Sequence, residues 1–173
     1  NIKKIKKGFK LIISAIKSKD VSDKRSVLHP ETIKNLISKG IEIIFESGIG
    51  DGIHVGDQTF IDLGAKPVSR ESCFSDAEII LTPSPIDDHE VNLIGDGKTL
   101  MGMVNPIENQ ELLKNLCDSH INVVSMEFVP RITRAQKMDV LSSQANLAGY
   151  VAVIESSSLL SSAMPMMMTA AGT

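Results

Sequence analysis

The chain has 173 residues, of which 42% are hydrophobic and 23% charged, and its formal net charge is −3. These values are typical of one soluble globular domain with a buried core, and they exclude a disordered chain. Aromatic residues make up only 3% and tryptophan is absent. A nucleic-acid-binding module that stacks bases on aromatic rings is therefore not expected.

The first 25 residues carry nine lysines or arginines against two aspartates, so the rest of the chain is acidic. We interpret residues 1–8 as a basic, solvated lead-in, with a phosphate-binding arm as the alternative. The sequence has no initiating methionine and no signal peptide, so we expect a piece of a longer protein. No apolar run reaches the roughly 18 to 20 residues of a membrane span. Two cysteines without CxxC spacing and four scattered histidines predict no metal site.

Short β-branched runs alternate with helical segments along residues 9–138, which we interpret as one α/β lobe. Pro30 is placed to begin a helix and Gly40 to end it. The alternation predicts an α/β fold with a doubly wound, mainly parallel sheet, Rossmann-like or flavodoxin-like. The expected strands are 9–16, 41–47, 77–82, 98–104 and 121–126, and the expected helices are 29–40, 56–65 and 109–120.

Three stretches resemble reactive sites, but their spacing favours simpler structures. The glycines of SGIGDGIHVG (47–56) miss the GxGxxG spacing by one residue, so this segment predicts a tight turn. Pro85 followed by the acidic residues 87–90 is typical of a helix start rather than of a cation site. The serines and methionines of 156–168 lack a glycine elbow and a nearby histidine, and we expect the methionines to fill apolar space.

The stretch PRITRAQKMDVLSSQANLAGY (130–150) is unusually polar for a segment that follows an apolar strand. Thr133 with Gln136 could form a helix capping box, and Asp139 is a second possible cap. Continued as one helix, the stretch carries its polar side chains from 136 to 150 on one face. Arg131, beside an amide and a carboxylate, suits a planar polar ligand such as a carboxamide or a phosphate. The residues alone leave a ligand site and a surface cap equally open.

The block VPRITRAQKMDVLSSQANLAGYVAV (129–153) resembles the alanine dehydrogenase and pyridine nucleotide transhydrogenase superfamily. Two further blocks support the resemblance, KRSVLHPETIKNLISKGIEIIFESGIGDG (24–52) and MTAAGT (168–173). Within that superfamily the sequence is similar to the NAD(H)-binding first domain of the proton-translocating NAD(P) transhydrogenases. The similarity covers nearly the whole chain from about Phe9.

The resemblance implies a mobile loop that approaches the nicotinamide end of NADH. Its catalytic positions fall on Arg131, Gln136 and Asp139, which also bind the cofactor, with Ser142 as a further contact on the carboxamide side. Gln136 is implied to lie between the two nucleotides. Hydride passes in this family from NAD(H) to NADP(H) held on a separate domain, without a metal, and is coupled to proton movement through a membrane domain.

The resemblance also implies a larger assembly around this chain. Residues 139–173 are the expected bridging helix and the start of a connection to a second Rossmann lobe, which is absent from this sequence. The chain alone is therefore expected to be inactive and to bind NAD(H) weakly or not at all. A homodimer is implied, and the apolar side of the last helix could pair with a second copy. The domain is expected at a membrane, on the cytoplasmic side in bacteria or in the mitochondrial matrix.

Two alternatives remain open. An alanine dehydrogenase resembles this sequence near Arg25, but that branch expects a lysine and a histidine where Ser84 and Asn105 stand. Without a cation and a general acid or base at a pyruvate carbonyl, amino-acid oxidation has no evident proton relay. The second alternative is a non-catalytic module whose 130–150 face docks a protein partner, with Arg131 as the anchor.

Overall fold

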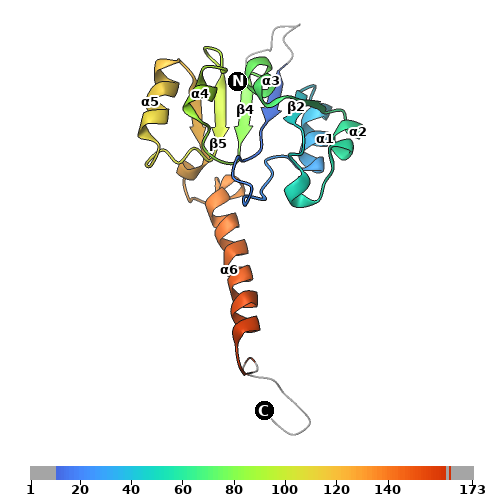
Figure 1. The fold of residues 1–173 in the computed structure, drawn as a ribbon, viewed down its shortest axis with the longest axis vertical. Coiled ribbons are helices and arrows are strands. Elements are labelled where there is room, and N and C mark those ends of the chain that lie inside the picture. The colour runs from blue at the N-terminus through green and yellow to red at the C-terminus, as the bar shows by residue number, and fades with distance from the viewer. Residues whose placement is uncertain (1–10, 163, 165–173) are drawn as a thin grey trace. The chain divides into compact units, whose positions relative to one another are not determined.

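A computed structural model describes residues 11–162 and residue 164 of the chain. The chain divides into two compact units, residues 1–128 and residues 129–173 (Figure 1). The expected lead-in and most of the methionine cluster lie outside the described residues.

The first unit contains a sheet of six parallel strands in the order β3-β2-β1-β4-β5-β6 (Figure 1). This order reverses direction between β1 and β4, as it does in the Rossmann fold, and so confirms the predicted doubly wound α/β class. A flavodoxin-like lobe has a different strand order. The strands are β1 (Ile12–Ala15), β2 (Glu42–Glu46), β3 (Lys66–Val68), β4 (Ile79–Thr82), β5 (Thr99–Gly102) and β6 (Asn122–Ser125).

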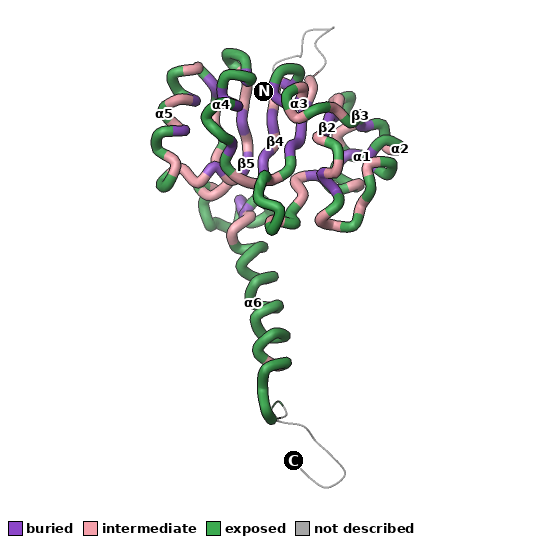
Figure 2. Tube along the Cα trace, in the orientation of Figure 1, coloured by how far each residue is buried: buried purple, intermediate pink, exposed green. Residues whose placement is uncertain are grey.

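Helices cover both faces of this sheet, because successive residues of a strand point to opposite sides. Ile13 and Ala15 of β1 join a core formed with α1 and α2, whereas Ile16 joins a second core formed with α3, α4 and α5. Purple segments in Figure 2 mark these buried strands and helix faces. The helices are α1 (Pro30–Ser38), α2 (Asp57–Asp62), α3 (Arg70–Asp76), α4 (Asp88–Val91) and α5 (Gln110–Asp118).

Local sequence signals place two of these helices as predicted. Pro30 is the first residue of α1, and Gly40 follows its end at a φ of 79°, a conformation that suits glycine. The acidic residues after Pro85 begin α4, where Asp87 and Glu90 form a reciprocal capping box. The acid/base alternative for that stretch is therefore not needed to explain it.

One strand and one helix between residues 66 and 76 were not predicted from the sequence. β3 has only three residues and contains Pro67, which cannot donate to a ladder and is tolerated on an edge strand. α3 follows at once, and Ser69 caps it by accepting the N–H of Ser72 at 3.2 Å. Neither element has the length that makes hydrophobic periodicity readable.

The ends of β4 and β5 lie so close together that only glycine fits between them. A Cβ on Gly102 would be 1.8 Å from the carbonyl oxygen of Thr82, its neighbour in the ladder. The φ of Gly102 is 153°, which side-chain-bearing residues rarely adopt. This contact holds the carboxyl ends of the two strands, and the loops that leave them, in a fixed relation.

The second unit contains a short 3₁₀ helix, η3 (Gln136–Met138), and the long helix α6 (Val140–Leu159). No residue of α6 is buried, and Figure 2 shows it as exposed along its length. Within residues 11–162 and at residue 164, no helix combines the length and the apolar character that crossing a membrane requires.

Candidate functional site

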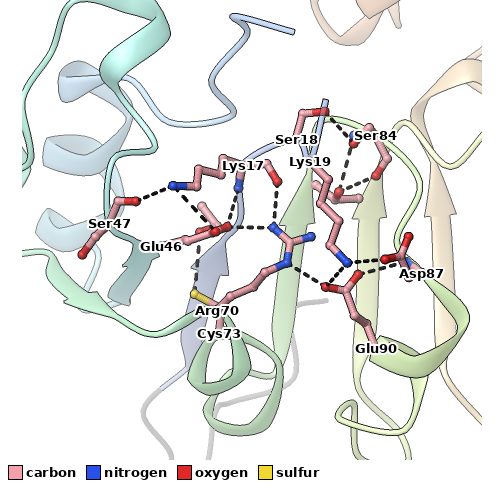
Figure 3. Close-up of polar contacts among 12 residues, drawn as sticks. Lys17, Ser18, Lys19, Glu46, Ser47, Arg70, Cys73, Ser84, Asp87 and Glu90 are labelled. Carbon is pink, nitrogen blue, oxygen red and sulfur yellow. Dashed lines mark hydrogen bonds and ion pairs between the residues drawn. The ribbon is translucent and has the colours of Figure 1, made fainter. Parts of the chain in front are cut away.

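Polar side chains gather at the carboxyl edge of the sheet in the first unit, where α/β folds bind ligands. Arg70, the first residue of α3, is at the centre of this group (Figure 3). Its Nε donates to Glu90 Oε1 at 2.7 Å, and its Nη1 donates to Glu46 Oε2 at 2.8 Å. Nη1 also donates to the carbonyl oxygen of Lys17 at 2.9 Å. One guanidinium thus ties the ends of β1 and β2 to α4.

Lysines complete this edge network from the segment that follows β1 (Figure 3). Lys19 Nζ lies 3.0 Å from Glu90 Oε1 and also pairs with Asp87. Lys17 Nζ donates to the carbonyl oxygen of Ser47 at 3.0 Å. The edge network is therefore the set of three cations and three carboxylates formed by Lys17, Lys19, Arg70, Glu46, Asp87 and Glu90.

Glu90 is the most deeply buried carboxylate of the edge network, with its side chain 3% exposed. Burial alone raises the pKa of a carboxyl, but hydrogen bonds from Arg70, the Asp87 N–H and Lys19 outweigh it and lower the pKa of Glu90. The pKa of Arg70 is raised despite its burial, because Glu90 and Glu46 stabilise its charge. Opposite charges balance within the network, so it is built to hold the loops together.

A pH dependence of stability follows from the lowered pKa of Glu90. A carboxyl whose pKa is lower in the folded than in the unfolded state stabilises the fold above its unfolded pKa, and this contribution is lost as pH falls through the folded pKa. We expect the urea midpoint to fall as the pH drops from about 5 to 3, and Glu90→Gln to flatten that slope. Asp118→Asn, at the exposed end of α5, is the control and should keep the parent slope. An unchanged slope in Glu90→Gln would contradict this role.

The two strand ends that flank the reversal of strand order carry hydroxyls and one arginine. Ser18 Oγ and Ser84 Oγ are 3.1 Å apart. Arg25 is held by Asp23, with its Nε 2.8 Å and its Nη2 2.7 Å from the two carboxylate oxygens. Arg25 Nη2 also donates to the carbonyl oxygen of Pro83 at 3.3 Å. This arginine is thus already neutralised by a neighbour of its own loop.

The positions at which the alanine dehydrogenase branch expects a lysine and a histidine have other roles here. Ser84 pairs with Ser18 and accepts a hydrogen bond from Thr82 through its carbonyl oxygen. Asn105 adopts a φ of 48°, and its N–H donates to Glu127 Oε1 at 2.6 Å. Neither side chain can supply a cation or a general base at neutral pH.

The glycine-rich segment 47–56 forms the predicted tight turn, including the 3₁₀ helix η1 (Asp51–Ile53). The N–H of Gly48 donates to both carboxylate oxygens of Asp57, at 2.9 and 3.1 Å. A Cβ on Gly50 would be 2.1 Å from the carbonyl oxygen of Val55, and one on Gly52 would be 2.3 Å from that of Lys24. These glycines allow close backbone packing, and a carboxylate already takes the N–H that a phosphate would use.

In the second unit, the segment before α6 brings two of the predicted site residues into direct contact. Asp139 is the N-cap of α6, and its Oδ1 accepts the N–H of Ser142 at 2.9 Å. Ser142 Oγ donates to the other carboxylate oxygen at 2.6 Å. These two bonds lower the pKa of Asp139, and the charge of Arg131 lowers it further. Asp139 is therefore an ionised acceptor near neutral pH.

Gln136 is positioned by backbone rather than by its side chain. It is the first residue of η3, and its carbonyl oxygen accepts the N–H of Asp139 at 3.4 Å. Arg131 and Gln136 are both exposed, so their donor groups are accessible. The segment thus contains a guanidinium, an amide, a carboxylate and a hydroxyl within twelve residues.

Two local predictions for this segment were wrong. The residue at the N-cap position of η3 is Ala135, no side chain caps that helix, and Thr133 does not form a capping box with Gln136. The stretch 136–150 is also not one helix, because Asp139 has an extended backbone (ψ 90°) and α6 begins at Val140. Gln136 and Asp139 therefore do not share a helical face with the polar residues of α6.

The edge network in the first unit was not predicted from the sequence. Arg70 and its two carboxylate partners are 20 and 24 residues apart in the chain. Only the capping box at Asp87 and Glu90 leaves a local signal. Within the part of the chain that the structure describes, no group of three or more histidine, cysteine or acidic side chains is arranged to hold a metal ion.

Residues 16–148 match the family model described as "Alanine dehydrogenase/PNT, N-terminal domain". The first of the separately encoded pieces of the NAD(P) transhydrogenase alpha subunit in Rickettsia prowazekii (strain Madrid E) is 41% identical over 166 residues, which cover 93% of this chain and 43% of that protein. The protein of the same name in Rhodospirillum rubrum is 38% identical over 168 residues, covering 93% of this chain and 44% of its own. The chain thus spans less than half the length of these relatives.

A solved structure gives the same result at the level of the fold. The crystal structure of a transhydrogenase from Sinorhizobium meliloti is similar with a TM-score of 0.84 and 37% identity, over 93% of this chain and 48% of the other. Both the sequence and the arrangement of elements are therefore shared with about half of that protein.

Proposed function

The chain belongs to the family of the alanine dehydrogenase/PNT N-terminal domain, and from this we propose that it is part of the NAD(H)-binding domain of a proton-translocating NAD(P) transhydrogenase. Its reaction is the transfer of hydride between NADH and NADP⁺. The observation that carries the proposal is the 41% identity, over 93% of this chain, to a relative named as an alpha-subunit protein of NAD(P) transhydrogenase.

The segment 131–142 supplies groups that fit the nicotinamide end of NAD(H). Arg131 has only donors and suits the carbonyl oxygen of a carboxamide. Gln136 can both donate and accept, and we place it between the two nucleotides. Asp139 holds the segment at the start of α6, and Ser142 adds a hydroxyl beside it. The nicotinamide rings supply the hydride chemistry, and the protein supplies binding and orientation.

The edge network does not take part in this proposal, because its charges are already paired. The transfer of hydride between two nicotinamide rings requires no protein acid or base. The absence of a lysine at Ser84 and of a histidine at Asn105 is therefore compatible with transhydrogenation and unfavourable for amino-acid oxidation. This comparison favours the transhydrogenase over the alanine dehydrogenase branch.

The proposal includes partners beyond this chain. The relatives are more than twice as long as the matched region, and we assign to the remainder a second Rossmann lobe that holds most of the NAD(H). An NADP(H)-binding domain and a membrane domain with a proton channel complete the assembly, and this domain lies peripheral to the membrane. Pairing of two copies is part of the same proposal, supported by the exposed apolar side chains of α6, Leu147, Tyr150, Val151 and Ile154.

The choice of oxidant separates the two branches of the family. We expect the full-length subunit that contains this chain, mixed with an NADP(H)-binding partner domain, to oxidise NADH with an NADP⁺ analogue. Pyruvate with ammonium should not oxidise NADH at a measurable rate, because Ser84 and Asn105 provide no proton relay. NADH absorbance at equal enzyme concentration measures both reactions. Rapid oxidation with pyruvate and ammonium alone would assign the chain to the alanine dehydrogenase branch.

A further inference from the structure

Asp139 and Ser142 share more than a helix cap. A cap requires one side-chain oxygen that accepts a backbone N–H, and Asp139 Oδ1 does this for Ser142 at 2.9 Å. The second oxygen, Oδ2, accepts the hydroxyl of the same residue at 2.6 Å. An ionised carboxylate has no proton, so Ser142 Oγ must be the donor in this bond. The only hydroxyl hydrogen of Ser142 is therefore directed at Asp139.

This bond fixes what Ser142 can offer to a ligand. A hydroxyl has one hydrogen and two lone pairs, so Ser142 Oγ is left as an acceptor. Arg131, whose charge acts on Asp139, has the opposite character, because a guanidinium has five donors and no acceptor. Gln136 has both kinds of group and cannot discriminate. Arg131 and Ser142 together present one donor and one acceptor.

We propose that Asp139, through its bond to the Ser142 hydroxyl, makes Ser142 a specificity-determining residue that selects a carboxamide over a carboxylate on the pyridine ring. This inference rests on the proposed function. A carboxamide has one acceptor oxygen for Arg131 and one N–H₂ donor for Ser142. A carboxylate has acceptors only, so it meets the lone pairs of Ser142 and the negative charge of Asp139.

The test compares the affinities of the full-length subunit for NAD⁺ and for nicotinic acid adenine dinucleotide, which differ in this group alone. In Asp139→Asn the amide oxygen can still cap Ser142, while the amide nitrogen donates to Ser142 Oγ and frees the hydroxyl hydrogen for a carboxylate. The ratio of the two dissociation constants should therefore fall by about tenfold or more. Ser142→Ala removes the acceptor, and it should lower the ratio mainly by weakening NAD⁺ binding.

Ser143→Ala is the matched control, because Ser143 Oγ donates to the backbone carbonyl oxygens of Asp139 and Val140. Its ratio should equal that of the parent. An unchanged ratio in both Asp139→Asn and Ser142→Ala overturns the inference. If NAD⁺ affinity also stays at the parent value in Arg131→Ala and Ser142→Ala, the proposed site itself is wrong. A parent that binds both dinucleotides equally overturns the selectivity alone.

Discussion

Replacing Arg70 with methionine is expected to lower the free energy of unfolding by about 3 kcal/mol or more, because the removal of one partner leaves buried charges uncompensated. The Arg70 side chain is 16% exposed, and those of Glu46 and Glu90 are 12% and 3% exposed. Methionine keeps much of the apolar stem that packs near the Phe74 ring, so the loss reports the charge. Urea unfolding followed by far-ultraviolet circular dichroism measures the change.

Lys66→Met is the control for this prediction. Lys66 pairs with Glu42 at the edge strand β3 and is 64% exposed, so its loss should cost at most about 1 kcal/mol. Adding Glu90→Gln to Arg70→Met should recover part of the lost stability, because it removes the charge that the first change leaves unpaired. Equal losses in Arg70→Met and Lys66→Met would mean that the edge network does not hold the strand ends.

The parts of the fold that were predicted correctly depend on short-range chemistry. Pro30 and Gly40 bound α1, and Asp87 with Glu90 starts α4, because each signal acts within one helical turn. Thr133 and Asp139 were equal candidates for a cap by the same rules. The backbone begins α6 after Asp139, where a carboxylate accepts both a backbone N–H and a hydroxyl.

The parts that were missed depend on contacts between distant residues. β3 is a strand only because β2 pairs with it, since three residues that include Pro67 carry no pattern of their own. Arg70 meets Glu46 and Glu90 only once the strands are in order. The roles assigned to Arg131 and Gln136 have a different origin, because they come from family resemblance. Local geometry explains Asp139 and Ser142 but does not by itself assign a ligand.

Arg131→Ala is expected to slow hydride transfer from NADH by about tenfold or more, equivalent to at least about 1.4 kcal/mol in the barrier. The reason is that a misplaced nicotinamide ring loses the alignment of the two reacting carbons. Gln136→Asn, which shortens the side chain by one methylene, should act in the same direction through the same alignment. Ser143→Ala, on the first turn of α6, should transfer hydride at the parent rate.

Single-turnover hydride transfer decides whether segment 131–142 is the nicotinamide site of a transhydrogenase. The full-length subunit containing this chain is mixed with its NADP(H)-binding partner domain, and the transfer from NADH to an NADP⁺ analogue is followed by stopped-flow absorbance. We predict that Arg131→Ala and Gln136→Asn lose about tenfold or more of the rate while the circular dichroism spectrum is unchanged. Transfer at the parent rate in both variants would contradict the site and leave these polar groups as surface caps.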